Sequence, residues 1–137
     1  MVEQTSAYGL GITVDLPYEE ALTRVRDELA KEGFGILTEI DVAGTLKKKI
    51  DVDFRPYTIL GACNPPLAHR ALSAEIDIGL LLPCNVIVYA AEEEGRSVVA
   101  AMDPEKALSI AENEAIAPLA GEVRERLERA LRSMETA

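Results

Sequence analysis

The sequence has no tryptophan, a single histidine and only two cysteines among its 137 residues. Two cysteines cannot form the dense disulfide network of a small secreted domain, and a chain of this length can bury a core without one. No apolar run reaches the roughly 18 residues that a membrane-spanning helix needs, and the first residues lack the basic and apolar regions of a signal peptide. We therefore expect a cytoplasmic protein that contacts no membrane and whose two thiols are reduced.

Positive charge is also scarce. The chain carries 14 Lys and Arg against 24 Asp and Glu, which gives a net charge of −10. Proteins bind phosphate backbones through clustered Lys and Arg, so we expect this acidic chain not to bind nucleic acid. The abundance of Arg and Glu relative to Gln and Asn is typical of a heat-adapted (thermophile) source.

The only basic run is Lys47-Lys48-Lys49. Such a run forms either an anion-binding patch or, more commonly, the solvated face of a helix, and we favour the helix face. Asp51 and Asp53 follow this run closely. Two carboxylates at this spacing can bind a hard cation, but their position directly after a helix favours a turn.

Length and periodicity predict a single α+β domain over residues 1–137, with a core over about 8–134. Leu10, Ile12 and Val14 alternate with small or polar residues, which indicates a strand with one apolar face. Pro17 and Gly33 bracket an amphipathic segment and predict a helix over 17–32. By the same reasoning we predict strands over 35–42, 56–62, 85–91 and 97–102, and helices after Thr45, after Pro65, over 104–111 and over 115–134.

The order of these elements predicts a two-layer sandwich, in which a mostly antiparallel sheet has helices on one face. The run from Val86 to Tyr89 is apolar on both of its faces, which predicts that the sheet is covered on both sides at this point and favours a homodimer. The sequence contains no GxGxxG or P-loop phosphate-binding motif and no GxSxG esterase motif.

Two short motifs carry most of the chemistry in the sequence. Gly61-Ala62-Cys63-Asn64-Pro65 and Leu82-Pro83-Cys84-Asn85-Val86 each join a cysteine to an asparagine beside a proline. Proline fixes the local backbone, and asparagine offers an amide that tolerates turn conformations. The first motif ends a predicted strand directly before a predicted helix, and that helix carries His69. The candidate ligand-binding residues are therefore Cys63, Asn64, Pro65, Pro83, Cys84 and Asn85.

These motifs allow four interpretations. The first is structural, with small buried cysteines at strand ends and prolines that shape the corners. The second is a pocket for a small molecule or effector in an apolar concavity of the sheet. The third is thiol-based redox or nucleophilic chemistry at Cys63 or Cys84, with Cys63 activated by the helix N-terminus and His69 as its base. The fourth is a soft metal held by Cys63, His69 and Cys84, although no paired CxxC or HxxxH spacing is present.

The two motifs, together with Leu80-Leu81 and Asp103-Pro104, resemble the signature of the domain of unknown function 302 family. The resemblance extends from about Tyr8 to Leu131. It implies a fold similar to that of the TATA-binding protein, in which helices back a curved antiparallel sheet, and it implies a dimer. It implies no activity, no cofactor and no catalytic residue, and the fold alone does not carry DNA binding to an acidic chain.

We therefore expect a homodimeric protein that binds a small molecule or effector near its two cysteine motifs. Thiol chemistry or soft-metal binding at the same residues is the alternative. The residues identify neither the ligand nor a cofactor.

Overall fold

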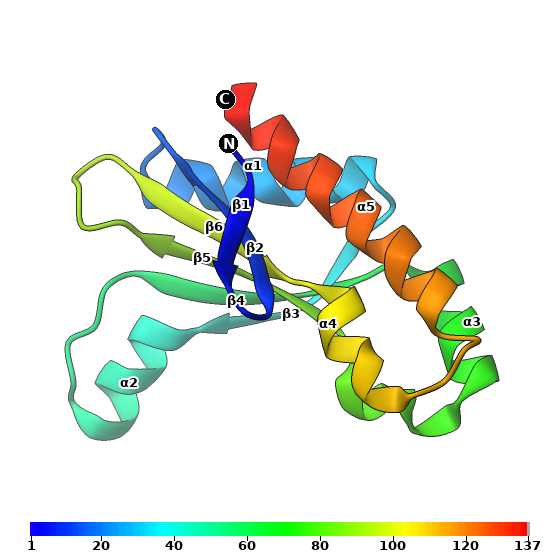
Figure 1. Cartoon of the computed structure of the whole chain (residues 1–137). Helices are drawn as coiled ribbons and strands as arrows, with labels where there is room; N and C mark the ends of the chain where they lie inside the picture. The colour runs from blue at the N-terminus through cyan, green and yellow to red at the C-terminus, as the bar shows by residue number, and fades with distance from the viewer. Residues whose placement is uncertain (137) are drawn as a thin grey trace.

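The computed structural model describes residues 1–136 and shows a six-stranded antiparallel sheet backed by helices (Figure 1). The strands lie in the order β1-β2-β6-β5-β4-β3. They are β1 (Glu3–Ser6), β2 (Gly9–Val14), β3 (Gly35–Asp41), β4 (Tyr57–Cys63), β5 (Cys84–Ala90) and β6 (Ser97–Met102). The helices are α1 (Tyr18–Lys31), α2 (Val42–Ile50), α3 (Pro65–Ala74), α4 (Pro104–Leu108) and α5 (Ala117–Ser133), with 3-10 turns at Ile76–Leu81, Ser109–Ala111 and Met134–Thr136. The predicted α+β fold is confirmed.

The two faces of the sheet differ because successive side chains of a strand point to opposite sides. One face, the covered face, packs against α1 and α5. The other face, which these helices leave uncovered, is the open face. Burial of one large apolar side chain stabilises a fold by ~1.5–3 kcal/mol. The core between the covered face and the helices is made of such side chains, among them Leu60, Val86, Val88, Val99, Val25, Leu29, Leu127 and Leu131.

The ends of the helices follow from local sequence. α1 begins directly after Pro17 and ends just before Gly33, whose φ of 86° is a conformation that favours glycine. α4 and α5 are separate helices, as predicted. Pro118 lies in the first turn of α5, where its missing N–H costs no hydrogen bond.

The chain between β3 and β4 forms an arm, made of α2 and residues 51–56, that stands apart from α1 and α5 (Figure 1). α2 begins at Val42 rather than near Thr45, because Asp41 caps it by accepting a 2.9 Å hydrogen bond from the Gly44 amide. No residue of α2 is buried. The lysine run therefore lies on a solvated helix, and Lys47 pairs with the two aspartates that follow it.

Two further features differ from what the sequence predicts. β1 was not predicted, because its residues Glu3–Ser6 are polar and show no apolar alternation. The expectation that the sheet is covered on both sides near residues 86–89 is wrong for the described chain. Val86 and Val88 are buried, but Ile87 and Tyr89 point to the open face and are partly exposed. Within residues 1–136, no helix is long and apolar enough to cross a bilayer.

Candidate functional site

A cavity of about 310 Å³ lies between the covered face of the sheet, α3 and α5. We call it the cysteine pocket, because both cysteines line it. None of its lining residues is charged, and Asn64 supplies the only side-chain amide. The rest of the lining is apolar, and most of it comes from Phe34, Leu67, Ala68, Ala71, Leu72, Leu82, Leu108, Leu119 and Val123.

The two cysteines lie near each other at the ends of neighbouring strands, and both line the pocket. Cys84 lies opposite Ala62 in the β4–β5 ladder, and Cys63 follows Ala62 directly. The structure has both thiols free. Cys84 is 7% exposed, whereas Cys63 is partly exposed at the end of its strand.

The two thiols differ in their chemistry because they differ in burial. Burial raises the pKa of the Cys84 thiol from 9.0 to about 11, and the neighbouring Cys63 adds to this rise because two thiolates repel each other. Cys84 is therefore protonated at neutral pH. A protonated thiol is a poor nucleophile and a poor metal ligand, so Cys84 behaves as a small apolar wall of the pocket.

Asn64 joins three elements beside the pocket. Its Oδ1 accepts a 3.4 Å hydrogen bond from the Leu67 amide and so caps α3. Its Nδ2 donates to the carbonyl oxygen of Glu32, at 3.5 Å, beyond the end of α1. A Cβ on Gly33 would lie 2.9 Å from that Nδ2, so the glycine also leaves room for the amide. Asn64, which directly follows Cys63 in the first motif, thus has a structural role whether or not it contacts a ligand.

The structure separates the remaining predicted site residues. Pro83 lines the pocket, but Pro65 is exposed in the first turn of α3. His69 is exposed on α3 and does not line the pocket. Asn85 is exposed on the open face, because it follows Cys84 on the same strand and therefore points the opposite way. Four of the six ligand candidates, Cys63, Asn64, Pro83 and Cys84, meet at the cysteine pocket.

No metal centre accompanies the pocket. Among residues 1–136, no group of three or more His, Cys, Asp or Glu side chains is placed to hold an ion. In particular, His69 does not line the pocket with Cys63 and Cys84, the two thiols that the soft-metal alternative groups with it.

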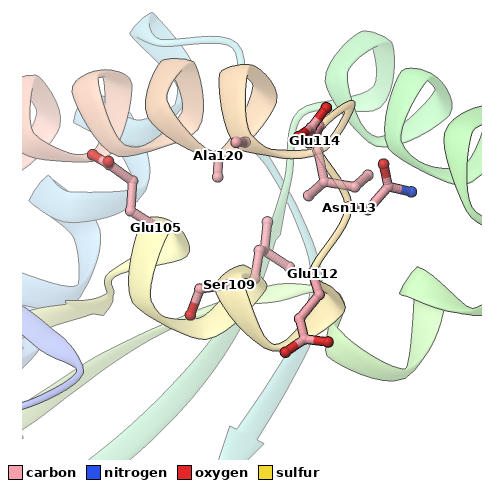
Figure 2. A pocket seen from close by; sticks show the side chains of 9 residues that line it. Glu105, Ser109, Glu112, Asn113, Glu114 and Ala120 are labelled. Atoms are coloured by element: carbon pink, nitrogen blue, oxygen red, sulfur yellow. The ribbon is translucent and has the colours of Figure 1, made fainter.

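A second hollow, of about 280 Å³, lies between α4 and the start of α5 (Figure 2). Two of its polar side chains, Asn113 and Ser109, already have hydrogen-bond partners. Asn113 donates to Glu75 at 3.1 Å and accepts from the Ala115 amide at 2.9 Å, and the Ser109 hydroxyl donates to the Lys106 carbonyl. The labelled carboxylates of Figure 2 point in different directions rather than toward one centre. This hollow is therefore a feature of the loop, and the cysteine pocket is the better candidate site.

Sequence reasoning found the cysteines and Asn64 but missed most of the pocket wall. Leu67 and Ala71 are four residues apart, a spacing that signals the buried face of a helix. That spacing does not reveal that the face borders a cavity. Phe34, Leu119 and Val123 reach the pocket from distant parts of the chain, and no local pattern links them to the cysteines.

The open antiparallel sheet, the helices on one side and the apolar pocket between them define a two-layer α+β protein with an internal candidate ligand site. Residues 10–134 match the model of the family described as "Domain of unknown function DUF302". The chain belongs to this family.

A solved structure supports the same assignment. The chain is similar to the uncharacterized conserved protein DUF302 from Bacillus stearothermophilus, with a TM-score of 0.86 and 28% sequence identity. The similarity covers 95% of this chain and 100% of the other. No functionally curated protein matches the sequence. The family assignment therefore supports the fold and leaves the activity to be argued from the site.

Proposed function

We propose that the cysteine pocket binds a small, uncharged and largely apolar molecule. The observation that supports this proposal is a cavity whose lining contains no charged side chain and whose buried Cys84 thiol is held protonated at neutral pH by a pKa raised to about 11. A volume of about 310 Å³ lies at the small end of the range for ligand pockets. At ~30 Å³ per water-sized group, the pocket holds a ligand of about ten non-hydrogen atoms.

The uncharged lining of the pocket disfavours charged ligands. A carboxylate or an ammonium group that entered would lose its hydration and find no ion-pair partner, a cost of several kcal/mol or about a thousandfold in affinity. An uncharged ligand with one polar atom faces no such cost, since it can place that atom near the Asn64 amide or the Cys63 thiol, which both line the pocket. The site therefore favours neutral over charged molecules of the same shape.

Calorimetric titration with indole tests the proposal directly. Indole is uncharged, largely apolar and close to the size of the pocket. We expect saturable binding of one indole per chain with a Kd of about 1 mM or tighter, because small ligands gain ~0.3–1.5 kcal/mol per non-hydrogen atom. Indole-5-carboxylate serves as the charged control and should bind at least about tenfold more weakly. Absence of saturable indole binding, or equal binding of the carboxylate, would contradict the proposal.

Thiol chemistry is the alternative function, and the burial of Cys84 argues against this cysteine as its nucleophile. At pH 8 we expect native Cys84 to react with iodoacetamide about a hundredfold more slowly than the same residue in urea, because a pKa of about 11 in place of 9.0 leaves that much less thiolate. The native rate should rise about tenfold per pH unit until pH reaches about 11.

Peptide mass spectrometry after timed quenching reads both cysteines in one experiment. Cys63, which is partly exposed, should label in the native protein and serves as the internal comparison. Rapid labelling of Cys84 that already levels off near neutral pH would mean a stabilised thiolate, and it would move thiol chemistry ahead of ligand binding.

We also propose that the protein is cytoplasmic, homodimeric and of heat-adapted origin. The two free thiols support the location, because thiols persist in reducing compartments. The Arg- and Glu-rich composition supports the origin. The partly exposed Ile59, Ile87 and Tyr89 side chains on the open face support the pairing of two copies.

A further inference from the structure

A third cavity, of about 370 Å³, lies on the open face where β1, β2, β6 and β5 adjoin. We call it the hydroxyl pocket, because its polar side chains are Thr5, Ser6, Tyr8, Tyr57 and Asn85. The rest of its lining is Gly9, Ile87, Ala100, Ala101 and Met102, so none of its ten lining residues is charged. Glu3, which pairs with Gly11, does not line it. The pocket includes Asn85, the motif residue that points away from the cysteine pocket.

A β-bulge in β1 places Thr5 at this pocket. The register of β1 on β2 shifts between Gln4 and Ser6, so Thr5 is an extra residue with no partner on β2. Its side chain lies across the open face, close to two glycines. A Cβ on Gly9 would lie 2.9 Å from Thr5 Oγ1, and a Cβ on Gly11 would lie 2.7 Å from Thr5 Cγ2. Bulges are common beside functional sites, where they change the direction of a side chain. The bulge and the two glycines together position the threonine hydroxyl.

Two tyrosine rings line the pocket on backbone that is already ordered. The Asp103 amide donates a 2.8 Å hydrogen bond to the Tyr8 carbonyl oxygen, and the Tyr8 amide donates a 3.3 Å hydrogen bond to the Ser6 hydroxyl. These bonds hold the β1–β2 turn, yet Tyr8 itself is 68% exposed. The Tyr57 ring stacks on Tyr89 with the ring centroids 5.3 Å apart. Both rings are therefore held in place without a ligand, and Tyr8 retains a large exposed surface.

The polar groups of the pocket are available to a ligand. Among residues 1–136, no protein group forms a hydrogen bond with the side chain of Thr5, Tyr57 or Asn85. Burial raises the pKa of Tyr57, and the neighbouring Tyr89 and Tyr8 raise it further, so the phenol is protonated at neutral pH and can donate. Hydroxyl and amide groups both donate and accept hydrogen bonds. A set of such groups matches a ligand that itself carries several hydroxyl groups.

We propose that the hydroxyl pocket binds a neutral sugar of hexose size. At ~30 Å³ per water-sized group, a cavity of about 370 Å³ holds about twelve non-hydrogen atoms, the number in a hexose. The sugar hydroxyls replace water on Thr5, Tyr57 and Asn85. The C–H groups on a face of the sugar ring are slightly positive and the face of an aromatic ring is negative, so the sugar ring lies against Tyr8.

The same lining disfavours a charged sugar. The pocket has no basic side chain to pair with a phosphate or a carboxylate, and the chain as a whole carries a net charge of −10. A sugar phosphate that entered would lose hydration without gaining an ion pair. Of the three residues that support the pairing of two copies, only Ile87 also lines this pocket, which extends from there toward β1 at the edge of the sheet.

NMR titration of the full chain with D-glucose, D-galactose and D-mannose tests the proposal. These hexoses differ only in the orientation of single hydroxyl groups. We expect at least one of them to shift the amide signals of residues 5–9, 85–87 and 100–102 saturably, with a Kd of about 10 mM or tighter. The 6-phosphate of that hexose is the charged control and should bind at least about tenfold more weakly. If none of the three hexoses gives saturable shifts at these residues, or if the phosphate binds as tightly as the free sugar, the proposal is wrong.

Two exposed positions allow variants that spare the core. Thr5→Ala removes the hydroxyl at the bulge and should weaken hexose binding about fivefold to tenfold. Thr13→Ala is the matched control, since Thr13 is an exposed threonine of β2 that does not line the pocket, and it should bind as the wild type does. Tyr8→Ser keeps a hydroxyl but removes the ring, and it should weaken binding about tenfold or more.

A Thr5→Ala variant that binds the hexose as tightly as Thr13→Ala, or a Tyr8→Ser variant that binds it as tightly as the wild type, would place the sugar outside the hydroxyl pocket and overturn the proposal. The hydroxyl pocket and the cysteine pocket share no lining residue. Hexose binding and indole binding therefore succeed or fail separately.

Discussion

An Ala68→Trp variant is expected to lose at least about tenfold of its affinity for indole, because the new side chain occupies the volume that the ligand needs. Ala68 lines the cysteine pocket from α3 and is only partly buried, so a larger side chain can enter the cavity without displacing the core. The proposed function depends on this cavity being open to a ligand of the same size. The substitution therefore removes the proposed function while it preserves the fold.

The sequence contains no tryptophan, so the fluorescence of the Ala68→Trp variant reports the surroundings of its single introduced indole ring. Its single indole ring should emit at a shorter wavelength when it lies in the apolar pocket than when it lies in water. Ala74→Trp is the matched control, since Ala74 lies at the end of the same helix, is exposed and does not line the pocket. The control should emit like an exposed tryptophan and should bind indole as the wild type does.

Two results would count against the cysteine pocket. If Ala68→Trp binds indole as tightly as Ala74→Trp while its own emission is that of a buried ring, indole binds elsewhere. If its emission is that of an exposed ring, the pocket does not accept even a tethered apolar group. The unfolding midpoint of both variants should stay close to that of the wild type, which separates pocket filling from loss of the fold.

Local sequence was sufficient to predict most elements of the fold. Leu10, Ile12 and Val14 specify β2 because period-2 alternation places all three on one face. Pro17 and Gly33 specify the ends of α1 because one fixes the backbone and the other adopts a positive φ. β1 escaped prediction for a physical reason. Its polar residues gain order only by pairing with β2, a tertiary interaction that leaves no local pattern.

The doubly apolar strand β5 shows where a correct observation led to a wrong structural conclusion. Ile87 and the ring of Tyr89 are largely apolar, like Val86 and Val88, and the sequence alone does not distinguish burial within one chain from burial between chains. The described chain covers only one side. If the proposed dimer forms, the prediction of a sheet covered on both faces holds for the assembly and fails only for the isolated chain.

Only part of the candidate site could be predicted from the sequence. The two Cys-Asn motifs suggested one shared site, but the two asparagines lie in different places in the structure. Asn64 follows the last residue of β4 and turns back to cap α3, whereas Asn85 lies inside β5 and points to the open face. Strand alternation would have separated Cys84 from Asn85 in advance. The pocket wall could not be predicted, because α5 supplies Leu119 and Val123 from more than 30 residues away.

Asp103 links β6 to the two last helices, and Asp103→Ala is expected to lower the free energy of unfolding by ~2–4 kcal/mol. Asp103 is buried, with 5% of the residue exposed. It caps α4 by accepting a 3.0 Å hydrogen bond from the Glu105 amide, and it accepts a 3.3 Å hydrogen bond from Arg124 on α5. Alanine removes both contacts at once. The loss stays below that of a fully buried ion pair because Arg124 is partly exposed and also lies near Glu105 and Glu128.

Asp103→Asn separates the two contributions, since asparagine is as good a helix cap as aspartate but carries no charge. We expect it to cost ~1–2 kcal/mol in urea unfolding at pH 7, about half the effect of alanine. Glu105→Gln, at an exposed position of the same ion-pair group, should stay within ~0.5 kcal/mol of the wild type. If asparagine and alanine cost the same, the charge rather than the cap holds α4 in place. Because Leu108 on α4 and Leu119 on α5 both line the cysteine pocket, the alanine variant should also bind indole more weakly, in proportion to how far the two helices separate.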